Sequence, residues 1–292
     1  MTLKALLKKG TQELLPVYDR AEAEASAWFL LAGCFAIDRK DYLLIEDHDV
    51  ENVKEAEYAS MINRRLNHEP TAYILGEWEF MGLPFEVNPS VLIPRPDTET
   101  VVEETIHYVH RSFPKGSRIR ILDICTGSGC IAVSLGYYLS QNYDLDLSAC
   151  DLSPEALETA KRNAVKNHTV VRFVCSDLLQ AFESETFDII VCNPPYVASK
   201  IVEGLEPDVR DYEPHLALDG GERGLNIYQR LIPQLPLYLT ENGAVFFEIG
   251  DEQADDVNKI FDQTQAFSEV KVVKDLAGHH RVVFGKKVGK NV

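Results

Sequence analysis

From residue 117 onward the sequence alternates short apolar runs with helical segments, and this alternation limits the fold more than any other feature. The runs are RIRILDI (118–124), LDLSAC (145–150), VVRFVC (170–175), FDIIVC (187–192) and GAVFFEI (243–249). Helices are expected from about 129, from 154 and near 225. This repeat predicts an α/β, Rossmann-like domain with a mostly parallel sheet covered on both faces. The tail, residues 267–287, has two β-type runs around a glycine turn and should add an antiparallel hairpin.

The first hundred residues have a different texture. An Ala-rich stretch, AEAEASAWFLLAGCFAI, is followed by apolar residues at three- and four-residue steps, which predicts a small helical domain. Residues 72–93 contain two β-type runs around Met81 and Gly82, which predicts a hairpin. PRPDTET then begins a helix, with Asp97 or Thr98 as the expected cap. We therefore expect a helical domain over 1–70, a β-hairpin linker over 71–96 and the α/β domain over 97–292.

Polar residues follow four successive predicted strands. Asp123 precedes a small-residue turn, residues 125–129, and Asp151, Asp177 and Asn193 follow the next three strands. Ligands of open α/β sheets bind beyond the carboxyl ends of the strands. Each acid alone could be an ordinary strand terminator, and the glycines alone could serve only a tight turn. Together, at successive strand ends, they favour one shared ligand site.

The composition of this turn argues against a dinucleotide. The GxGxxG pattern would need glycine at 125 and 130, where this chain has cysteine, and Asp123 would stand close to a pyrophosphate. An acid suits a ligand with an ammonium group. S-adenosylmethionine carries one, together with a sulfonium charge, a ribose diol and an adenine amine, and these groups match three acids better than NAD does.

The fourth strand leads into Asn193, Pro194, Pro195 and Tyr196. Proline has no N–H, so the backbone here offers carbonyls with few competing donors, and the Asn193 side chain adds another oxygen. Such a pocket can hold both hydrogens of a planar NH2 group while Tyr196 packs on its plane. The alternative is a plain strand-ending turn. The weakly periodic stretch that follows, up to about Leu225, is long enough to suggest a functional loop.

The overall composition narrows the partners. The chain has 29 basic and 46 acidic residues, a net charge of −17, which disfavours nucleic acid as a direct substrate. No apolar run approaches a membrane span, and we identify no signal peptide. The six cysteines form no CxxC pair, so we expect small buried thiols in a reducing cytoplasm, with no disulfide and no metal site.

Several stretches together resemble a known family. They are ILDICTGSGCIAVSL, DLSPEAL, NPPYV and EPHLALDGGERGL, with PTAYILGEWEF and VLIPRPDTE upstream. These stretches resemble the release-factor glutamine methyltransferases, also called the HemK family. The resemblance covers about residue 60 to the end, and the preceding helical domain is also typical of that family. NPPY alone is less specific, because DNA adenine methyltransferases and some ribosomal RNA methyltransferases share it.

The resemblance implies a class I methyltransferase fold and methylation of the side-chain amide of the glutamine in the Gly-Gly-Gln motif of class I peptide chain release factors. S-adenosyl-L-methionine would be the donor, and the helical domain would dock the release factor. The implied donor-binding residues include Asp151 and Asn193, with Asp177 and Leu178 beside the adenine. The turn contributes Cys125, Thr126, Gly127, Ser128 and Gly129. The implied glutamine-binding and catalytic residues are Asn193, Pro194, Pro195 and Tyr196.

Two positions depart from the family pattern, and three more match it without a clear role. Cys125 stands where many relatives have glycine, and Leu178 where some have an aromatic that could stack on adenine. Arg95, Glu99 and Glu213 match family positions around the pocket, and we expect them to position the substrate or the loop. Their alternative is a plain helix start and a solvated loop acid.

Two other functions remain open at this stage. The same pocket could accept an exocyclic amine of DNA or RNA, although a DNA methyltransferase would need a sizeable basic recognition region. The fold could also persist as a non-catalytic scaffold, whose expected mark would be loss of the strand-end acids or of Asn193. Both are present.

Overall fold

The computed structural model describes residues 1–289, and the chain divides into two compact units. The helical unit comprises Met1–Glu77 and Glu206–Tyr212. The second unit comprises Trp78–Leu205 and the chain from Glu213 onward. These limits differ from the expected boundaries at 70 and 96, and the short segment 206–212 returns to the helical unit from far along the sequence.

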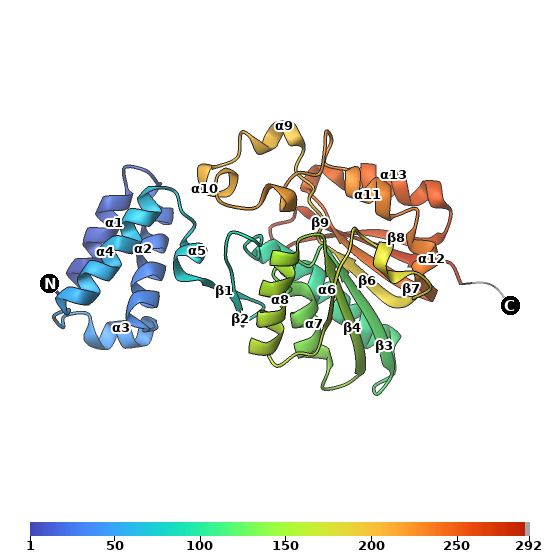
Figure 1. Ribbon diagram of the computed structural model, residues 1–292, viewed down its shortest axis with the longest axis horizontal. Coiled ribbons are helices and arrows are strands. Elements are labelled where there is room, and N and C mark those ends of the chain that lie inside the picture. The colour runs from blue at the N-terminus through green and yellow to red at the C-terminus, as the bar shows by residue number, and fades with distance from the viewer. Residues whose placement is uncertain (290–292) are drawn as a thin grey trace. The chain divides into compact units, whose positions relative to one another are not determined.

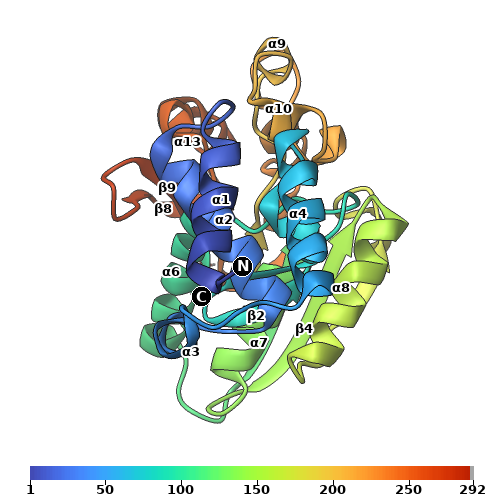
Figure 2. The same cartoon turned by 90° about the vertical axis from the view of Figure 1, so that its left-hand side faces the viewer.

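The helical unit is built on three long helices, α1 (Leu3–Leu14), α2 (Arg20–Phe35) and α4 (Asn52–Leu66), which pack side by side (Figure 2). Short helices α3 (Arg39–Ile45) and α5 (Thr71–Leu75) complete its first part. The Thr2 and Asp19 side chains cap α1 and α2 by accepting the backbone N–H groups of Ala5 and Glu22. The expected helical character of this region is confirmed.

The segment 206–212 is held to the helical unit by polar contacts. It contains the single-turn helix α10 (Pro207–Arg210). The Arg65 side chain is almost fully buried and contacts Glu22 at 2.6 Å and Asp208 at 3.3 Å. The Tyr212 hydroxyl donates to the backbone carbonyl of Asn67 at 2.7 Å. A buried guanidinium needs such acidic partners, so Asp208 is part of this unit's polar core.

The second unit contains a seven-stranded sheet in the order β5-β4-β3-β6-β7-β9-β8. Five strands are parallel, and β9 joins β7 and β8 antiparallel, which confirms the predicted sheet and terminal hairpin. The strands are β3 (Arg118–Ile124), β4 (Asp144–Asp151), β5 (Arg172–Cys175), β6 (Phe187–Cys192), β7 (Leu239–Glu248), β8 (Phe267–Lys274) and β9 (His280–Lys287). Chain order reverses between β3 and β6, which is where ligands bind in such sheets.

Helices cover both faces of this sheet (Figure 1). One face packs against α6 (Pro96–Ser112), α7 (Cys130–Leu139) and α8 (Pro154–Lys166). The other packs against α11 (Asn226–Leu231), α12 (Leu235–Tyr238) and α13 (Ala254–Thr264). Neighbouring strand residues alternate between the two cores, as Ile121 and Leu122 do in β3. The strands are therefore apolar on both sides, which explains their nearly continuous apolar sequence.

The hairpin belongs to the second unit rather than forming a separate linker. Strands β1 (Glu77–Phe80) and β2 (Leu83–Glu86) are joined by Met81 and Gly82, both with positive φ, 53° and 69°. A two-residue turn of this conformation matches the twist of paired strands. Phe80, Leu83 and Phe85 are buried in the core of the second unit. The turn was predicted correctly, but the hairpin is part of the larger domain.

Some local predictions were wrong. Residues 71–75 form α5 instead of a strand, and Gly76 ends this helix with a φ of 74°. Helix α6 is capped by neither Asp97 nor Thr98, because Pro96 already takes its first turn and Arg95 is the N-cap. The long stretch after Tyr196 also contains α9 (Ser199–Val202) and a 3-10 turn (His215–Ala217), and two more 3-10 turns span Gln180–Phe182 and Asp251–Gln253. Over residues 1–289, no helix combines the length and apolarity needed to cross a bilayer.

Candidate active site

A cavity of about 430 Å³ lies at the carboxyl ends of the parallel strands, within the second unit. That volume is in the range of small-molecule sites. Ten of the predicted site residues line it: Arg95, Cys125, Thr126, Gly127, Ser128, Asp151, Asp177, Leu178, Asn193 and Pro195. Six others are not among its lining residues in the described part of the chain: Asp123, Gly129, Pro194, Tyr196, Glu99 and Glu213.

The turn after β3 brings backbone close to the cavity. Cys125, Gly127 and Gly129 have φ values of 60°, 53° and 80°. A Cβ on Gly129 would stand 3.0 Å from the Cβ of Ala160 in α8, so close packing and a positive φ both require glycine there. Cys125 adopts the left-handed conformation in spite of its side chain, which is uncommon for such a residue. A cysteine at this position therefore costs conformational energy but keeps the turn.

Asp151 holds this turn to the end of β4. One carboxylate oxygen accepts the backbone N–H of Gly127 at 2.8 Å, and the other accepts that of Ser153 at 3.0 Å. Burial raises the pKa of Asp151, whereas these N–H groups lower it. Each oxygen keeps a lone pair, so the cavity-lining carboxylate can still accept hydroxyl hydrogens.

Asp123 has a different place from the one expected. Its carboxylate accepts from the Thr126 hydroxyl at 2.6 Å and the Ala132 backbone at 3.2 Å, and only 1% of the residue is exposed. Its Oδ1 has no partner within residues 1–289, and burial raises its pKa to about 7. Ile124 and Cys125, which follow Asp123, line the cavity, whereas Asp123 is buried and accepts hydrogen bonds from Thr126 of the turn and Ala132 of α7. The predicted contact with an ammonium group does not fit this geometry.

Asp177 and Leu178 form the wall beyond β5. The Asp177 carboxylate accepts from the Arg230 guanidinium at 2.7 and 2.8 Å. Leu178 is buried, with a φ of 53°. Arg230 and Ile227, from α11, line the same cavity and were not identified from sequence. A single arginine in a short helix carries no local signal for such a role.

The segment that follows β6 contacts two residues, Thr98 and Glu248, that the sequence analysis did not identify as part of the site. The Asn193 side-chain amide donates to the Thr98 hydroxyl at 3.3 Å, and the Tyr196 hydroxyl donates to Glu248 Oε1 at 3.2 Å. Thr98 and Glu248 are both nearly fully buried, and burial raises the pKa of Glu248 to about 7. Glu248 ends β7, so it is a fifth polar residue at a parallel strand's carboxyl end. Its position at a strand end could have identified Glu248 as a candidate site residue from the sequence.

The long segment returns to the cavity through Glu213. This buried carboxylate accepts the Ile93 backbone N–H at 3.1 Å and forms an ion pair with Arg95. Further along, Gly220 lies so close to the strand-end backbone that a Cβ would stand 2.6 Å from the Pro195 carbonyl oxygen. Glu213 and Arg95 thus hold the returning segment at the cavity rim, which agrees with a loop-positioning role.

Glu99 serves the hairpin instead of the cavity. Its Oε1 accepts the backbone N–H of Met81 at 2.7 Å, and the Tyr138 hydroxyl donates to the Met81 carbonyl at 2.6 Å. Both contacts fix the hairpin turn on helices α6 and α7. The expected place near the pocket is therefore not what the structure gives Glu99.

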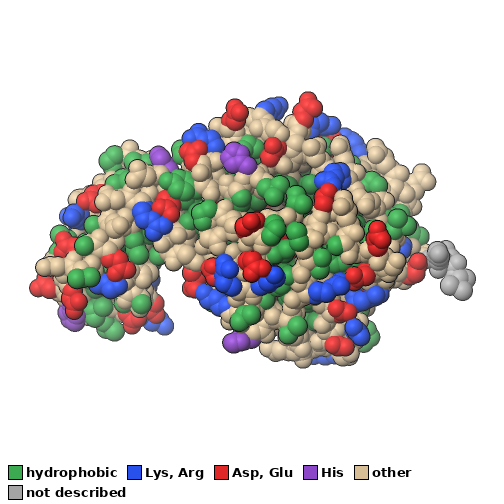
Figure 3. Space-filling view, viewed as in Figure 1, with side chains coloured by type: hydrophobic (Ala, Val, Ile, Leu, Met, Phe, Trp, Pro, Cys, Tyr) green, Lys and Arg blue, Asp and Glu red, His purple; other side chains and the backbone are tan. Residues whose placement is uncertain are grey.

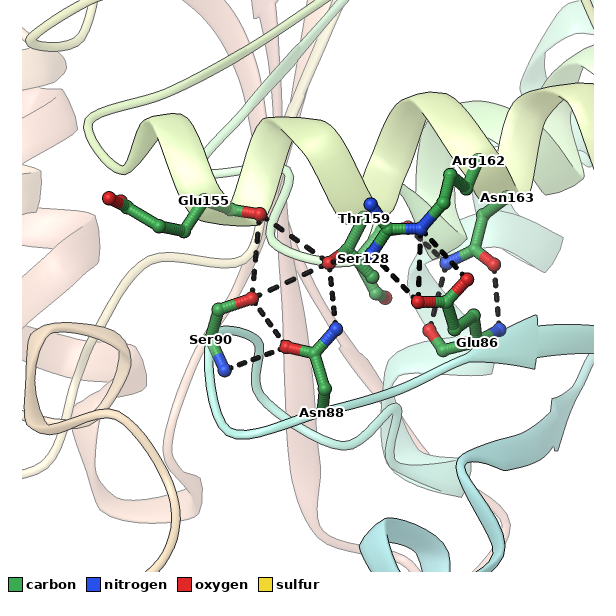
Figure 4. Close-up of polar contacts among 8 residues, drawn as sticks. All are labelled: Glu86, Asn88, Ser90, Ser128, Glu155, Thr159, Arg162 and Asn163. Carbon is green, nitrogen blue, oxygen red and sulfur yellow. Dashed lines mark hydrogen bonds and ion pairs between the residues drawn. The ribbon is translucent and has the colours of Figure 1, made fainter.

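Helix α8 forms hydrogen bonds both with the segment after the hairpin and with the turn 125–129 (Figure 4). Asn163, fully buried, donates to the carbonyls of Glu86 and Ser128 at 3.0 and 2.9 Å and accepts the Glu86 N–H at 2.6 Å. Asn88 donates to Thr159 at 2.9 Å. Because Ser90 and Ser128 both line the cavity, these bonds fix two of its walls against one helix.

Two surface properties bear on the sequence predictions. On the face shown in Figure 3, basic side chains lie among acidic ones rather than in one broad patch. Four cysteines are buried, whereas Cys125 is half-buried and Cys175 is exposed, so the prediction of buried thiols was wrong for Cys175. The reason is that β5 is an edge strand of the sheet.

Comparisons with known proteins agree with this architecture. Residues 5–76 match a family model described as PrmC N-terminal domain, and residues 105–205 match one described as Methyltransferase small domain. A release factor glutamine methyltransferase of Koribacter versatilis is 39% identical over 288 residues, covering 98% of this chain and 99% of the relative. Another, of Geobacter sulfurreducens, is 38% identical over 258 residues, covering 88% and 87%. A methyltransferase structure from Pyrococcus furiosus, 18% identical, has a TM-score of 0.51 and covers 82% of this chain and 100% of that chain, a likeness of fold alone.

Proposed function

Because the chain belongs to the release factor glutamine methyltransferase family, we propose that it transfers a methyl group from S-adenosylmethionine to the side-chain amide nitrogen of a glutamine. The substrate glutamine is that of the Gly-Gly-Gln motif of class I peptide chain release factors, and the place of action is the cytoplasm. The observation that carries this proposal is the continuity of one cavity from Asp151 and Gly127 to Asn193 and Pro195. Donor and acceptor sites thereby share a single space.

The residues of the cavity fit S-adenosylmethionine. Asp151 offers carboxylate oxygens to a ribose diol, and the turn 125–129 offers closely approaching backbone. Leu178 and Ile227 provide apolar surface for adenine, with Asp177 beside it. When bound, the donor supplies a methyl group activated by its sulfonium charge.

The protein's own contribution is to hold the glutamine amide. The Asn193 side-chain oxygen can accept one of the two amide hydrogens, and the carbonyl of Pro194, which lies between the cavity-lining residues Asn193 and Pro195, can accept the other. An amide nitrogen is a poor nucleophile because its lone pair is delocalised, and hydrogen bonds to both hydrogens favour the pyramidal, nucleophilic form. Alignment of two reacting groups is worth roughly 7 to 11 kcal/mol in well-oriented systems. Positioning can therefore supply most of the rate enhancement.

The helical unit contributes none of the described residues that line the cavity. We assign it to docking the release factor. The mixed charges in Figure 3 and the net charge of −17 favour a protein substrate over a nucleic acid.

The decisive experiment is mass spectrometry of a purified class I release factor after incubation with this protein and S-adenosylmethionine. One added methyl group on the Gly-Gly-Gln glutamine is expected. Asn193→Ala should bind the donor with nearly unchanged affinity and lose turnover by orders of magnitude. Transfer only to tRNA, rRNA or duplex DNA, offered in parallel, would overturn the proposal.

A further inference from the structure

The side chain of Gln253 joins three separate backbone segments of the second unit. Its Nε2 donates to the carbonyl of Tyr196 at 3.0 Å and to the carbonyl of Gly224 at 3.1 Å. Its Oε1 accepts the backbone N–H of Gly250 at 2.9 Å. One side chain therefore links the Asn-Pro-Pro-Tyr segment, the end of the long returning segment and the turn after β7. We call these three hydrogen bonds the Gln253 clasp.

The clasp requires a carboxamide. A carboxamide nitrogen has two hydrogens to donate, and its oxygen accepts, which matches two carbonyls and one N–H group. Only one orientation of the Gln253 amide satisfies all three partners. A glutamate carboxylate would place an oxygen against both carbonyls, and a leucine would offer them no hydrogen. Either replacement would therefore break the bonds to Tyr196 and Gly224.

The segments that meet at the clasp pack without room for further side-chain atoms. A Cβ on Gly224 would stand 2.1 Å from the Tyr196 carbonyl oxygen and 2.7 Å from Gln253 Nε2. A Cβ on Gly220 would stand 2.6 Å from the Pro195 carbonyl oxygen and 2.9 Å from the Tyr196 Cα. The backbone of Pro195 and Tyr196 is thus in direct contact with the returning segment, and Gln253 holds both together.

The two prolines carry this constraint back toward the reacting end. Proline has φ fixed at about −65°, and a residue that precedes a proline is confined to extended conformations. Both restrictions act on Pro194, and Asn193 also precedes a proline. Little freedom is left between Cys192, where β6 ends, and the clasped carbonyl of Tyr196. The direction of the Pro194 carbonyl therefore depends on where Tyr196 is held.

We propose that Gln253 is a positioning residue for methyl transfer, which acts through the Tyr196 carbonyl to aim the Pro194 carbonyl at the glutamine NH2 group. This inference rests on the proposed function and deepens it. Asn193 and Pro195, on either side of Pro194, line the cavity, whereas Gln253 is not among its lining residues within 1–289. Its effect on the substrate amide is therefore indirect.

The test compares variants of Gln253 with the wild type, with release factor and S-adenosylmethionine as substrates. Gln253→Leu and Gln253→Glu should each lower kcat roughly 10- to 100-fold, because a misplacement of about 1 Å at the reacting group can slow a reaction that much. The clasp does not involve the turn 125–129, so the Kd of S-adenosylmethionine in calorimetric titration should stay near the wild-type value. Gln263→Glu, the same chemical change at an exposed position of α13, is the matched control and should leave kcat unchanged.

Two further measurements distinguish positioning from loss of folded protein. The stoichiometry of donor binding gives the folded fraction of each variant, so kcat is expressed per donor-binding site. Gly224→Ala disturbs the same clasp from the second carbonyl and should also lower kcat. Combined with Gln253→Leu, it should be little slower than the slower single variant, because both changes displace the Tyr196 carbonyl.

The outcomes separate this inference from the proposed function. A wild-type protein that fails to methylate release factor refutes the function itself, and the inference with it. The function stands and the inference is wrong if the wild type methylates while both Gln253 variants keep their kcat. The same conclusion follows if these variants lose donor binding in step with kcat, or if the double variant shows additive losses.

Discussion

The buried carboxylate of Asp123 should make the stability of the second unit fall as pH rises. Burial raises its pKa from 3.8 to about 7, so the folded state holds a proton that the unfolded chain has released between these values. The folded state is therefore favoured at the acidic end of this window. Its contribution is lost as pH rises through the folded-state pKa.

The size of the effect follows from the two pKa values. Between about pH 5.5 and about pH 8, proton linkage for one such group amounts to about 2 kcal/mol of unfolding free energy. Asp123→Asn removes that titration while keeping an oxygen for Thr126 and the Ala132 backbone. Glu248 still titrates in the variant, so about half of the combined pH dependence of these two acids should remain.

Urea denaturation at both pH values measures the difference. The chain's two tryptophans, Trp28 and Trp78, lie one in each unit, so a Trp28→Phe background leaves Trp78 fluorescence to report the second unit. Carboxylates with a lowered pKa, such as Glu86 beside Arg162, titrate below this pH window and give no slope within it. They are the same in both proteins and cancel in the comparison.

The reasoning is refuted if Asp123→Asn changes stability equally at the two pH values. That result would mean that Asp123 titrates normally and is hydrated in the folded state. A general packing defect in Asp123→Asn would lower its unfolding free energy by the same amount at both pH values. It would therefore not change how much less the stability of the variant depends on pH than that of the wild type.

Three further predictions concern the cavity. Gly129→Ala places a methyl group against Ala160 at a φ of 80° and should destabilise the fold by about 1 to 3 kcal/mol, seen as a lower urea midpoint. Glu213→Gln weakens the ion pair with Arg95 and should raise the KM for release factor several-fold, with donor affinity unchanged in calorimetric titration. Arg230→Ala frees Asp177 and should change donor affinity in that titration, whereas Arg223→Ala, whose partner is Asp256, should not.

The sheet could be predicted because its signals are local. The runs at 118–124 and 187–192 coincide with β3 and β6, since a strand buried on both faces needs continuous apolar residues. The strand ends then located Asp151, Asp177 and Asn193 without any knowledge of contacts. Glu248 lies at the same kind of position and could have been found by the same rule.

The remaining features depend on contacts between distant parts of the chain. Thr98 lies 95 residues from Asn193, and the contact between them follows only from how α6 packs. The Asp123 side chain is buried under the turn 125–129, and this burial depends on the residue at which β3 ends. The start of α6 was predicted too late because Pro96 can serve in a first helical turn, so a proline did not mark a break there.

The return of residues 206–212 to the helical unit means that the polypeptide passes between the two units three times, after Glu77, after Leu205 and after Tyr212. After a single proteolytic cut following Glu77, the first helices would keep only non-covalent contacts with segment 206–212. One of these contacts is the ion pair of Arg65 with Asp208, which lies on the other side of the cut. A truncated protein that starts at Trp78 would keep the acidic segment 206–212 but would lack Arg65, the ion-pair partner of Asp208. Such a fragment would not reproduce the structure of this segment in the full chain.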